Sequence, residues 1–312
     1  MNQAVNYDPA STLRFVINAG AGHNAADAKR EVIETALAEA GRRGELLFAP
    51  PPELAATAAR AAEAAVAEGG AVVAVGGDGT INTVAQAAHD RGCAMGVLPQ
   101  GTFNYFARTH GIGSEPAEAA RGLLQWQPQP VQVAHCNGHL FLVNASLGMY
   151  PQLLEDREAY KARFGRSRLV ALGAAIATLL GKHRRLRLHV DLNGSTRDVQ
   201  TQTLFVGNNA LQLQQVGLSE AQAPENGRIA AVMLRPLGTL SMLGLLLRGA
   251  MGTLGDASTV ESFEFQHMIV KPRRRFGARG IKAACDGEIV WLLPPLEFGV
   301  SPRPLFLLKP QA

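Results

Sequence analysis

The sequence predicts an α/β protein with two domains, a doubly wound N-terminal domain and a C-terminal antiparallel β-sandwich. Three observations favour this fold. Strand and helix patterns alternate through residues 1–130, and glycine-rich turns follow three of the expected strands. Beyond Pro128 and Pro130 the pattern changes to short strands, so the second domain is placed at residues 131–312. Whether the last strand returns to the first domain is left open.

The first domain is expected to hold a parallel sheet, because β-rich runs alternate with amphipathic helical stretches. Ile33 and Leu37, for example, share one apolar face of the expected helix 28–40. Strands are expected at residues 13–17, 45–49, 71–75 and 95–98, and helices at 28–40, at 54–67 and from residue 81. In this layout ligands bind at the carboxyl ends of the strands.

The second domain reads as antiparallel, because two Asn-Gly pairs, at residues 137–138 and 193–194, favour tight hairpin turns. The expected strands are 131–136, 139–144, 186–192, 197–206, 229–233, 262–270, 281–284 and 289–293. Asp286-Gly287 also lies between two of these strands, so a plain hairpin turn is one interpretation of that pair.

The composition fits a soluble globular protein and excludes several other classes. At 312 residues, 47% of them apolar, the chain is long enough for two cores. Its net charge of +4 is diffuse and its aromatic residues are sparse, so no nucleic-acid partner is expected. The three cysteines show no CxxC spacing, which argues against a disulfide framework or a zinc site. The N-terminus has no signal-peptide pattern, so the cytoplasm is the expected location.

The motif GGDGT at residues 76–80 directly follows the buried-strand pattern 71–75 and precedes a helical pattern. Glycines let backbone N–H groups approach a ligand, and a helix start adds free N–H groups, so the turn suits a phosphate chain. Asp78 would then face a Mg²⁺ ion or a hydroxyl that must lose its proton. A structural turn with Asp78 as a surface cap is the alternative.

Two more turns follow expected parallel strands. NAGAG at residues 18–22 follows the first strand, and PQGTFN at residues 99–104 follows the fourth. Each turn by itself is weak support for a binding site. Because the carboxyl ends of parallel strands meet at one sheet edge, the three together favour a nucleotide phosphate site.

Four motifs in order resemble the diacylglycerol kinase catalytic-domain family, which includes bacterial lipid kinases and the sphingosine kinases. They are NxxxG at 18–22, GGDGT at 76–80, PxGTxNxFAR at 99–108 and DGE at 286–288. The related NAD kinases share GGDGT but not the PxGTxNxFAR stretch. The resemblance spans residues 13 to about 310.

The resemblance implies phosphorylation of a lipid hydroxyl, diacylglycerol-like or sphingoid, by ATP with Mg²⁺. It implies that Glu288 is the proton acceptor, with Asp286 and Asp78 assisting through Mg²⁺ or the incoming hydroxyl. The residues expected to bind the nucleotide are Asn18, Ala19, Gly20, Ala21, Gly22, Gly76, Gly77, Asp78, Gly79, Thr80, Asn82, Gly101, Thr102 and Asn104.

Several positions depart from the family pattern. Thr83 and Tyr105 stand where the family often has Glu and Asp, and Pro50-Pro51 cannot supply the usual threonine hydroxyl. Asn226 stands where some members hold a structural Mg²⁺ with a carboxylate, so a metal site there should be weaker or absent. Thr83, Tyr105 and Asn226 keep one rival function open, a catalytically silent nucleotide- or lipid-binding regulator. The rival among enzymes is a soluble-substrate kinase of the NAD kinase type.

Contact with a membrane is expected to be peripheral. The apolar segments 169–181 and 237–255 fall short of the about 20 apolar residues that a span needs, so buried or interfacial helices are expected there. Within them, residues 169–180 and 243–247 either pack as core or line an acyl-chain pocket. The basic clusters 182–185 and 271–275 are either solvated faces or a rim attracted to an anionic surface. The expected location is the cytoplasmic side of the inner membrane, and a homodimer is left open.

Overall fold

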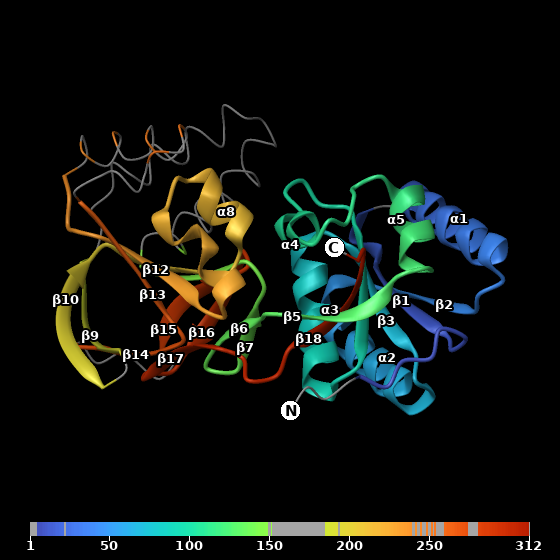
Figure 1. Cartoon of the computed structure of the whole chain (residues 1–312), viewed down its shortest axis with the longest axis horizontal. Coiled ribbons are helices and arrows are strands. Elements are labelled where there is room, and N and C mark those ends of the chain that lie inside the picture. The colour runs from blue at the N-terminus through green and yellow to red at the C-terminus, as the bar shows by residue number, and fades with distance from the viewer. Residues whose placement is uncertain are drawn as a thin grey trace. The chain divides into compact units, whose positions relative to one another are not determined.

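The computed structural model describes residues 5–21, 23–148, 185–192, 194–238, 259–273 and 280–311, and the single residues 151, 241, 244, 248, 251 and 253. The chain forms two compact units, and Figure 1 labels their elements. The first unit comprises Met1–Val133 and Ser301–Ala312, and the second comprises Ala134–Val300.

The first unit is built on a six-stranded sheet with the spatial order β2-β1-β3-β4-β18-β5. Its strands are β1 Leu13–Asn18, β2 Gly44–Ala49, β3 Ala71–Gly76, β4 Ala94–Pro99, β5 Gln127–Val131 and β18 Leu305–Lys309. Its helices are α1 His23–Ala40, α2 Leu54–Glu68, α3 Asp78–Arg91, α4 Tyr105–Thr109 and α5 Pro116–Leu123, with short 3-10 turns at η1 Ala19–Ala21 and η2 Pro51–Glu53. All strand pairs are parallel except β18 with β5.

Helices cover both faces of this sheet: α1 and α5 lie on one face and α2 and α3 on the other (Figure 1). Phe15 and Val73 belong to the core beneath α1 and α5. On the opposite face, Ala58 and Ala62 of α2 are fully buried. Alanine leaves no long side chain between helix and sheet, so α2 can lie close to the strands.

The predicted doubly wound sheet is confirmed, and each of its four predicted strands is right to within one residue at either end. Neither β5 nor β18 was among the expected strands. The change of pattern at Pro128 and Pro130 predicts the end of the first domain's sheet, but both prolines lie in β5, which is an edge strand of that sheet. An edge strand tolerates proline because one row of its N–H groups has no partner strand.

The second unit is a sandwich of two six-stranded sheets. One sheet has the order β10-β9-β14-β17-β6-β7, with β6 Ala134–Cys136, β7 His139–Phe141, β9 Leu186–Leu192, β10 Ser195–Thr201, β14 His267–Pro272 and β17 Leu296–Val300. The other has the order β13-β12-β11-β8-β15-β16, with β8 Asn144–Gly148, β11 Thr203–Gly207, β12 Ile229–Leu234, β13 Val260–Phe265, β15 Ile281–Cys285 and β16 Glu288–Leu292.

One core cluster joins the inner faces of the two sheets. It includes Phe141 and Phe298 from the first sheet and Leu147 and Phe265 from the second, all nearly inaccessible to solvent. Helix α8 (Ala210–Gln215) and the 3-10 segment η3 (Ser219–Asn226) pack on the outer face of the second sheet through a smaller cluster. The predicted antiparallel β-sandwich is therefore confirmed.

Four of the strands expected in the second domain were wrong, because each is divided between two strands in different sheets. Residues 131–136 divide between β5 and β6. Residues 197–206 divide at Gln202 into β10 and β11, and residues 262–270 divide at Gln266 into β13 and β14. Residues 139–144 likewise divide between β7 and β8. A chain that crosses from one sheet to the other keeps its β-rich pattern, so the pattern did not mark the crossings. Strand β17 was missed altogether.

The hairpin predicted at Asn137-Gly138 is confirmed, since both residues have positive φ (48° and 81°) and join β6 to β7. Gly194 (φ 83°) follows β9, whereas Asn193 lies outside the described residues. Other expectations also fall on residues that the structure does not describe. They are the apolar segment 169–181, most of 237–255, and the basic residues 182–184 and 274–275. Among the described residues, none of the helices is long and apolar enough to cross a membrane.

Candidate functional site

The GGDGT turn joins the end of β3 to the start of α3. Gly77 is the helix N-cap with an extended backbone (φ −82°, ψ −176°), and Asp78 is the first helical residue. Gly76 is needed for packing, because a Cβ atom there would lie 2.6 Å from Oγ1 of Thr80. The turn thus presents backbone N–H groups at a helix N-terminus, as a phosphate-binding turn requires.

Asn18 connects the end of β1 to this turn. Its Nδ2 atom donates a hydrogen bond to Oγ1 of Thr80 over 3.2 Å, and its Oδ1 atom accepts the N–H of Gly20 over 2.9 Å. A Cβ atom on Gly20 would come within 3.1 Å of Asn18 Oδ1 and 3.3 Å of Pro51, so glycine suits this position. The first and second predicted loops therefore meet at one edge of the sheet.

Asn104 holds the third loop, between β4 and α4, against the GGDGT turn. It is buried and has a left-handed backbone (φ 48°). Its side-chain amide accepts the N–H of Gly101 and donates to the Gly101 carbonyl, each over 2.9 Å. A Cβ atom on Gly101 would lie 3.0 Å from the Cα of Gly77, so only glycine lets the two loops approach this closely.

Asp78 lies where the three loops meet. Its Oδ2 atom accepts the backbone N–H of Asn104 over 3.3 Å, whereas its buried Oδ1 atom has no hydrogen-bond partner among the residues that the structure describes. Burial raises the pKa of the Asp78 carboxyl above its usual value, and the N–H groups of Asn104 and Tyr105 partly oppose that rise. A buried carboxylate oxygen without a partner is costly unless a ligand supplies one.

This arrangement fits a magnesium ion that is held mostly by a phosphate ligand. Mg²⁺ commonly takes one or two protein carboxylates and completes its shell with substrate phosphates and water. Asp78 offers one such carboxylate beside backbone N–H groups that suit phosphate. Within the described ranges, no three His, Cys, Asp or Glu side chains gather into a ready-made metal cage.

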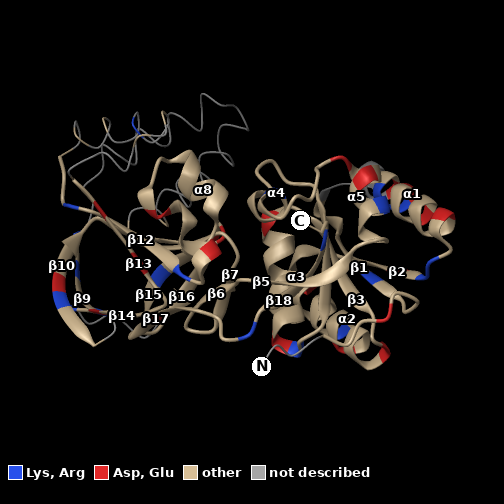
Figure 2. Ribbon diagram, viewed as in Figure 1, with Lys and Arg blue, Asp and Glu red and all other residues tan. Residues whose placement is uncertain are grey.

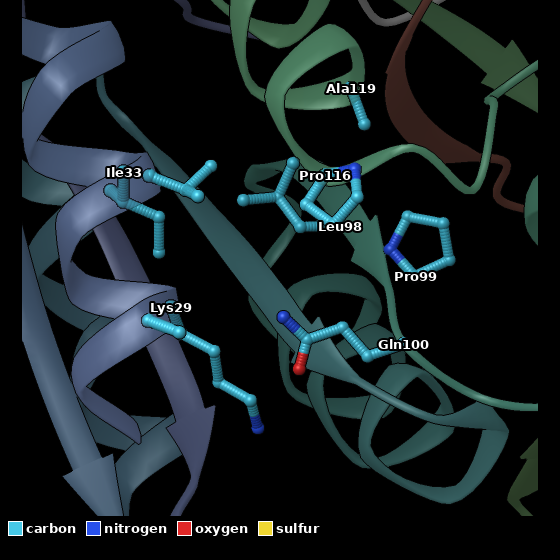
Figure 3. A pocket seen from close by; sticks show the side chains of 9 residues that line it. Lys29, Ile33, Leu98, Pro99, Gln100, Pro116 and Ala119 are labelled. Carbon is cyan, nitrogen blue, oxygen red and sulfur yellow. The ribbon is translucent and has the colours of Figure 1, made fainter. Parts of the chain in front are cut away.

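A small pocket opens on the α1 and α5 face near the end of β4 (Figure 3). Its volume is about 140 Å³, and Ile33, Leu98 and Ala119 make much of its wall apolar. Lys29 and Gln100 add polar groups, and burial lowers the pKa of Lys29. Pro99 and Gln100 at the start of the third loop line this pocket, but none of residues 76–80 does, so the phosphate site is assigned to the GGDGT turn and not to the pocket.

The DGE motif lies in the second unit, at the turn between β15 and β16. Asp286 and Gly287 both have positive φ (46° and 86°), which is typical of a type I′ hairpin turn. Glu288 begins β16; its side chain is exposed and makes no hydrogen bond or ion pair within the described part of the chain. It is therefore accessible to a substrate.

The Asp286 carboxylate binds the backbone of its own unit. Its Oδ2 atom accepts the N–H of Leu142 over 2.7 Å, and its Oδ1 atom accepts the N–H groups of Val143 and Asn144, each over 2.9 Å. These three hydrogen bonds fasten the hairpin to the connection between β7 and β8. Asp286 thus fixes the position from which Glu288 projects.

Several other expected site residues lie at these elements. Ala19, Gly20 and Ala21 form η1, whereas Gly22 is outside the described residues. Thr102 is exposed in the loop after β4, and Asn82 lies in α3. Thr83 donates its hydroxyl hydrogen bond to the Gly79 carbonyl over 2.9 Å, within the helix itself. Asn226 is exposed at the end of η3, and a metal site there stays a prediction.

Two features of the site were missed in the sequence. One is an aromatic pair, Phe103 and Tyr105, on either side of Asn104. The other is a buried polar group beside Asp286: Asn144 donates to Gln212 over 3.1 Å, and Asn208 donates to the Leu142 carbonyl over 3.2 Å. The sequence contains a signal for this buried polar group: an asparagine interrupts an otherwise apolar strand pattern in FLVNAS at 141–146.

Comparisons with known proteins agree on one family. Residues 12–136 match the family described as the diacylglycerol kinase catalytic domain. A probable lipid kinase YegS-like of Pseudomonas aeruginosa PAO1 is 32% identical over 80% of this chain and 80% of its own length. A diacylglycerol kinase of Bacillus subtilis strain 168 is 38% identical over 31% of this chain and 33% of its own.

A solved structure has the same fold. It is a putative diacylglycerol kinase from Bacillus anthracis str. Sterne, with a TM-score of 0.74, 18% sequence identity, and coverage of 96% of this chain and 97% of that one. At this identity the likeness concerns the fold alone.

Proposed function

Because the chain belongs to the diacylglycerol kinase catalytic-domain family, we propose that it transfers the γ-phosphoryl group of ATP to a lipid hydroxyl. The observation that carries the proposal is the meeting of three glycine-containing strand-end loops around Asp78, whose Oδ1 atom is buried without a described partner. Phosphoryl transfer depends mainly on positioning and on neutralising charge, which such a site supplies.

Each residue has a defined role in the proposed reaction. The N–H groups at the start of α3 bind phosphate oxygens, and Asn18 and Asn104 hold the loops that carry them. Asp78 would hold a Mg²⁺ ion, which would supply positive charge to neutralise the phosphate groups. Glu288 accepts the proton of the lipid hydroxyl, and Asp286 positions the hairpin that carries Glu288.

A labelling experiment tests this function against its two rivals. The purified protein is incubated with γ-labelled ATP, Mg²⁺ and separate samples of diacylglycerols, sphingoid bases and NAD. Label in the lipid extract is the expected result, whereas label in NADP would instead favour the soluble-substrate kinase. ATP binding without transfer to any acceptor would favour the silent regulator.

Gly79→Val should abolish ATP binding while the protein stays folded. Gly79 is the second residue of α3, and a Cβ atom with two methyl groups would block the approach of phosphate to the backbone. The dissociation constant for ATP and the melting temperature are the two measurements. Gly113→Val is the matched control, because a Cβ atom on Gly113 would meet no atom within 4 Å. Undiminished ATP binding by Gly79→Val would leave the turn with a structural role only.

We also propose that the protein is cytoplasmic and reaches its lipid by peripheral contact with the inner membrane face. Figure 2 shows basic and acidic residues mixed along the ribbon of α1 and at β10, not gathered by sign there. Arg273 forms an ion pair with Asp198, which reduces the net charge of that basic cluster. Anionic lipid therefore has to compete with the Asp198 carboxylate for the guanidinium of Arg273.

Binding to vesicles should rise with anionic lipid and fall with salt, since surface charges are screened within a Debye length of about 8 Å at physiological ionic strength. Changing Arg273, Arg274 and Arg275 together to serine should weaken binding in a sedimentation assay. Asp198→Asn should strengthen it, because Arg273 loses its partner carboxylate. Equal binding to neutral and anionic vesicles would contradict a basic contact surface.

A further inference from the structure

An aromatic pair stands directly beside the three-loop phosphate site. The rings of Phe103 and Tyr105 are nearly parallel, with an angle of 3° between their planes and 5.8 Å between their centroids. The guanidinium of Arg108 lies 6.0 Å from the centroid of the Tyr105 ring. Phe103 is nevertheless 50% exposed, so this large apolar ring is far from fully covered by the protein.

The loop that carries this pair is held firmly. Asn104, between the two aromatic residues, is only 5% exposed and is fixed by its hydrogen bonds to Gly101 and by its N–H bond to Asp78. Arg108 adds a hydrogen bond of 3.5 Å to the Phe103 carbonyl. Because Tyr105 supports the Phe103 ring, a ligand that stacks on Phe103 would meet a ring that is already in place, which lowers the entropy cost of binding.

We propose that the Phe103 ring stacks against the base of the bound nucleotide. This inference rests on the proposed function, which puts the phosphate chain of ATP at the GGDGT turn. Phe103 directly precedes Asn104, whose backbone N–H donates a hydrogen bond to Asp78. It also lies two residues after Gly101, which packs closely on Gly77 of the turn. A nucleotide whose phosphates occupy that turn has its one flat aromatic group, the base, available to stack on the exposed Phe103 ring.

Stacking of this kind adds affinity without choosing the base, because every nucleobase has a π face. The Phe103 side chain has no hydrogen-bonding group, so it cannot distinguish adenine from guanine by their edges. We therefore expect Phe103 to contribute similarly to the binding of ATP and GTP. Any preference between these nucleotides has to come from other residues.

The test compares a nucleotide with a phosphate chain that has no base. Dissociation constants for ATP and for inorganic tripolyphosphate, both with Mg²⁺, are measured on the full-length protein and on Phe103→Ala. Loss of base stacking should weaken ATP binding about 5- to 150-fold and leave tripolyphosphate binding unchanged. Phe103→Trp should keep ATP affinity, and Phe103→Leu, which keeps an apolar side chain without a ring, should lose it.

Trp291→Ala is the matched control. Trp291 is 51% exposed, like Phe103, but it is not part of the three loops of the phosphate site, so removing this ring should leave ATP affinity as it is. Melting temperatures of all variants report whether each remains folded, and Phe103→Leu provides the comparison if Phe103→Ala unfolds.

Several outcomes would overturn the inference. Equal weakening of ATP and tripolyphosphate would mean that Phe103 shapes the phosphate loop and does not contact the base. Unchanged ATP affinity with reduced binding to anionic vesicles would assign the ring to a membrane surface. If Phe103→Ala binds ATP as the parent does, only the stacking fails, whereas a parent protein that binds no ATP would overturn the proposed function as well.

Discussion

Glu288→Gln is expected to lower the turnover of the best lipid substrate about 100- to 10,000-fold, the usual contribution of a general base, while ATP affinity changes little. The exchange keeps the size of the side chain and removes the group that accepts the proton. Glu288 is exposed at the start of β16 and bonds to none of the described side chains, so the melting temperature should stay the same. Steady-state kinetics, ATP titration and thermal unfolding measure the three quantities.

Two further variants make this prediction specific. Glu297→Gln changes another exposed glutamate of the same unit and should keep parent turnover. Asp286→Asn should lower the melting temperature as well as turnover, because its carboxylate accepts three backbone N–H groups and an amide offers only one acceptor oxygen. Hydrogen bonds to charged groups contribute roughly 1.5–3 kcal/mol each to stability. Near-parent turnover of Glu288→Gln would exclude Glu288 as the proton acceptor.

Asp78→Asn is expected to lower turnover strongly and yet not to destabilise the fold. Burial raises the pKa of the Asp78 carboxyl, so this group binds a proton more readily in the folded protein than in the unfolded chain. A raised pKa gives stability that is present below the unfolded pKa and is lost as the pH rises through the folded pKa. At neutral pH the ionised Asp78 therefore costs stability, and a neutral asparagine removes that cost.

The Asp78→Asn experiment has two separate measurements. The melting temperature at pH 7 should equal or exceed that of the parent, and the advantage should vanish as the pH falls below the unfolded pKa of the carboxyl. Turnover should recover in part at high Mg²⁺ if Asp78 positions the metal, whereas Glu288→Gln should show no such recovery. A lower melting temperature together with parent-like turnover would give Asp78 a purely structural role.

The sequence by itself determined four of the six strands of the first unit, the helices between those strands, and the loops of its site. Strands 13–17, 71–75 and 95–98 are short apolar runs that end in glycine-containing turns, and parallel strands must bring those ends to one edge. The Asn-Gly and Asp-Gly pairs fixed two hairpins, because these dipeptides accept the positive φ that tight turns need. These features depend on neighbours in the chain.

Only the tertiary structure decided the features that depend on residues far apart in the chain. It split the β-rich run 197–206 between two sheets and made the proline-containing β5 an edge strand, since pairing partners and not local pattern set those outcomes. It gave Asp286 three backbone N–H groups from residues 142–144 and left Oδ1 of Asp78 without a described partner.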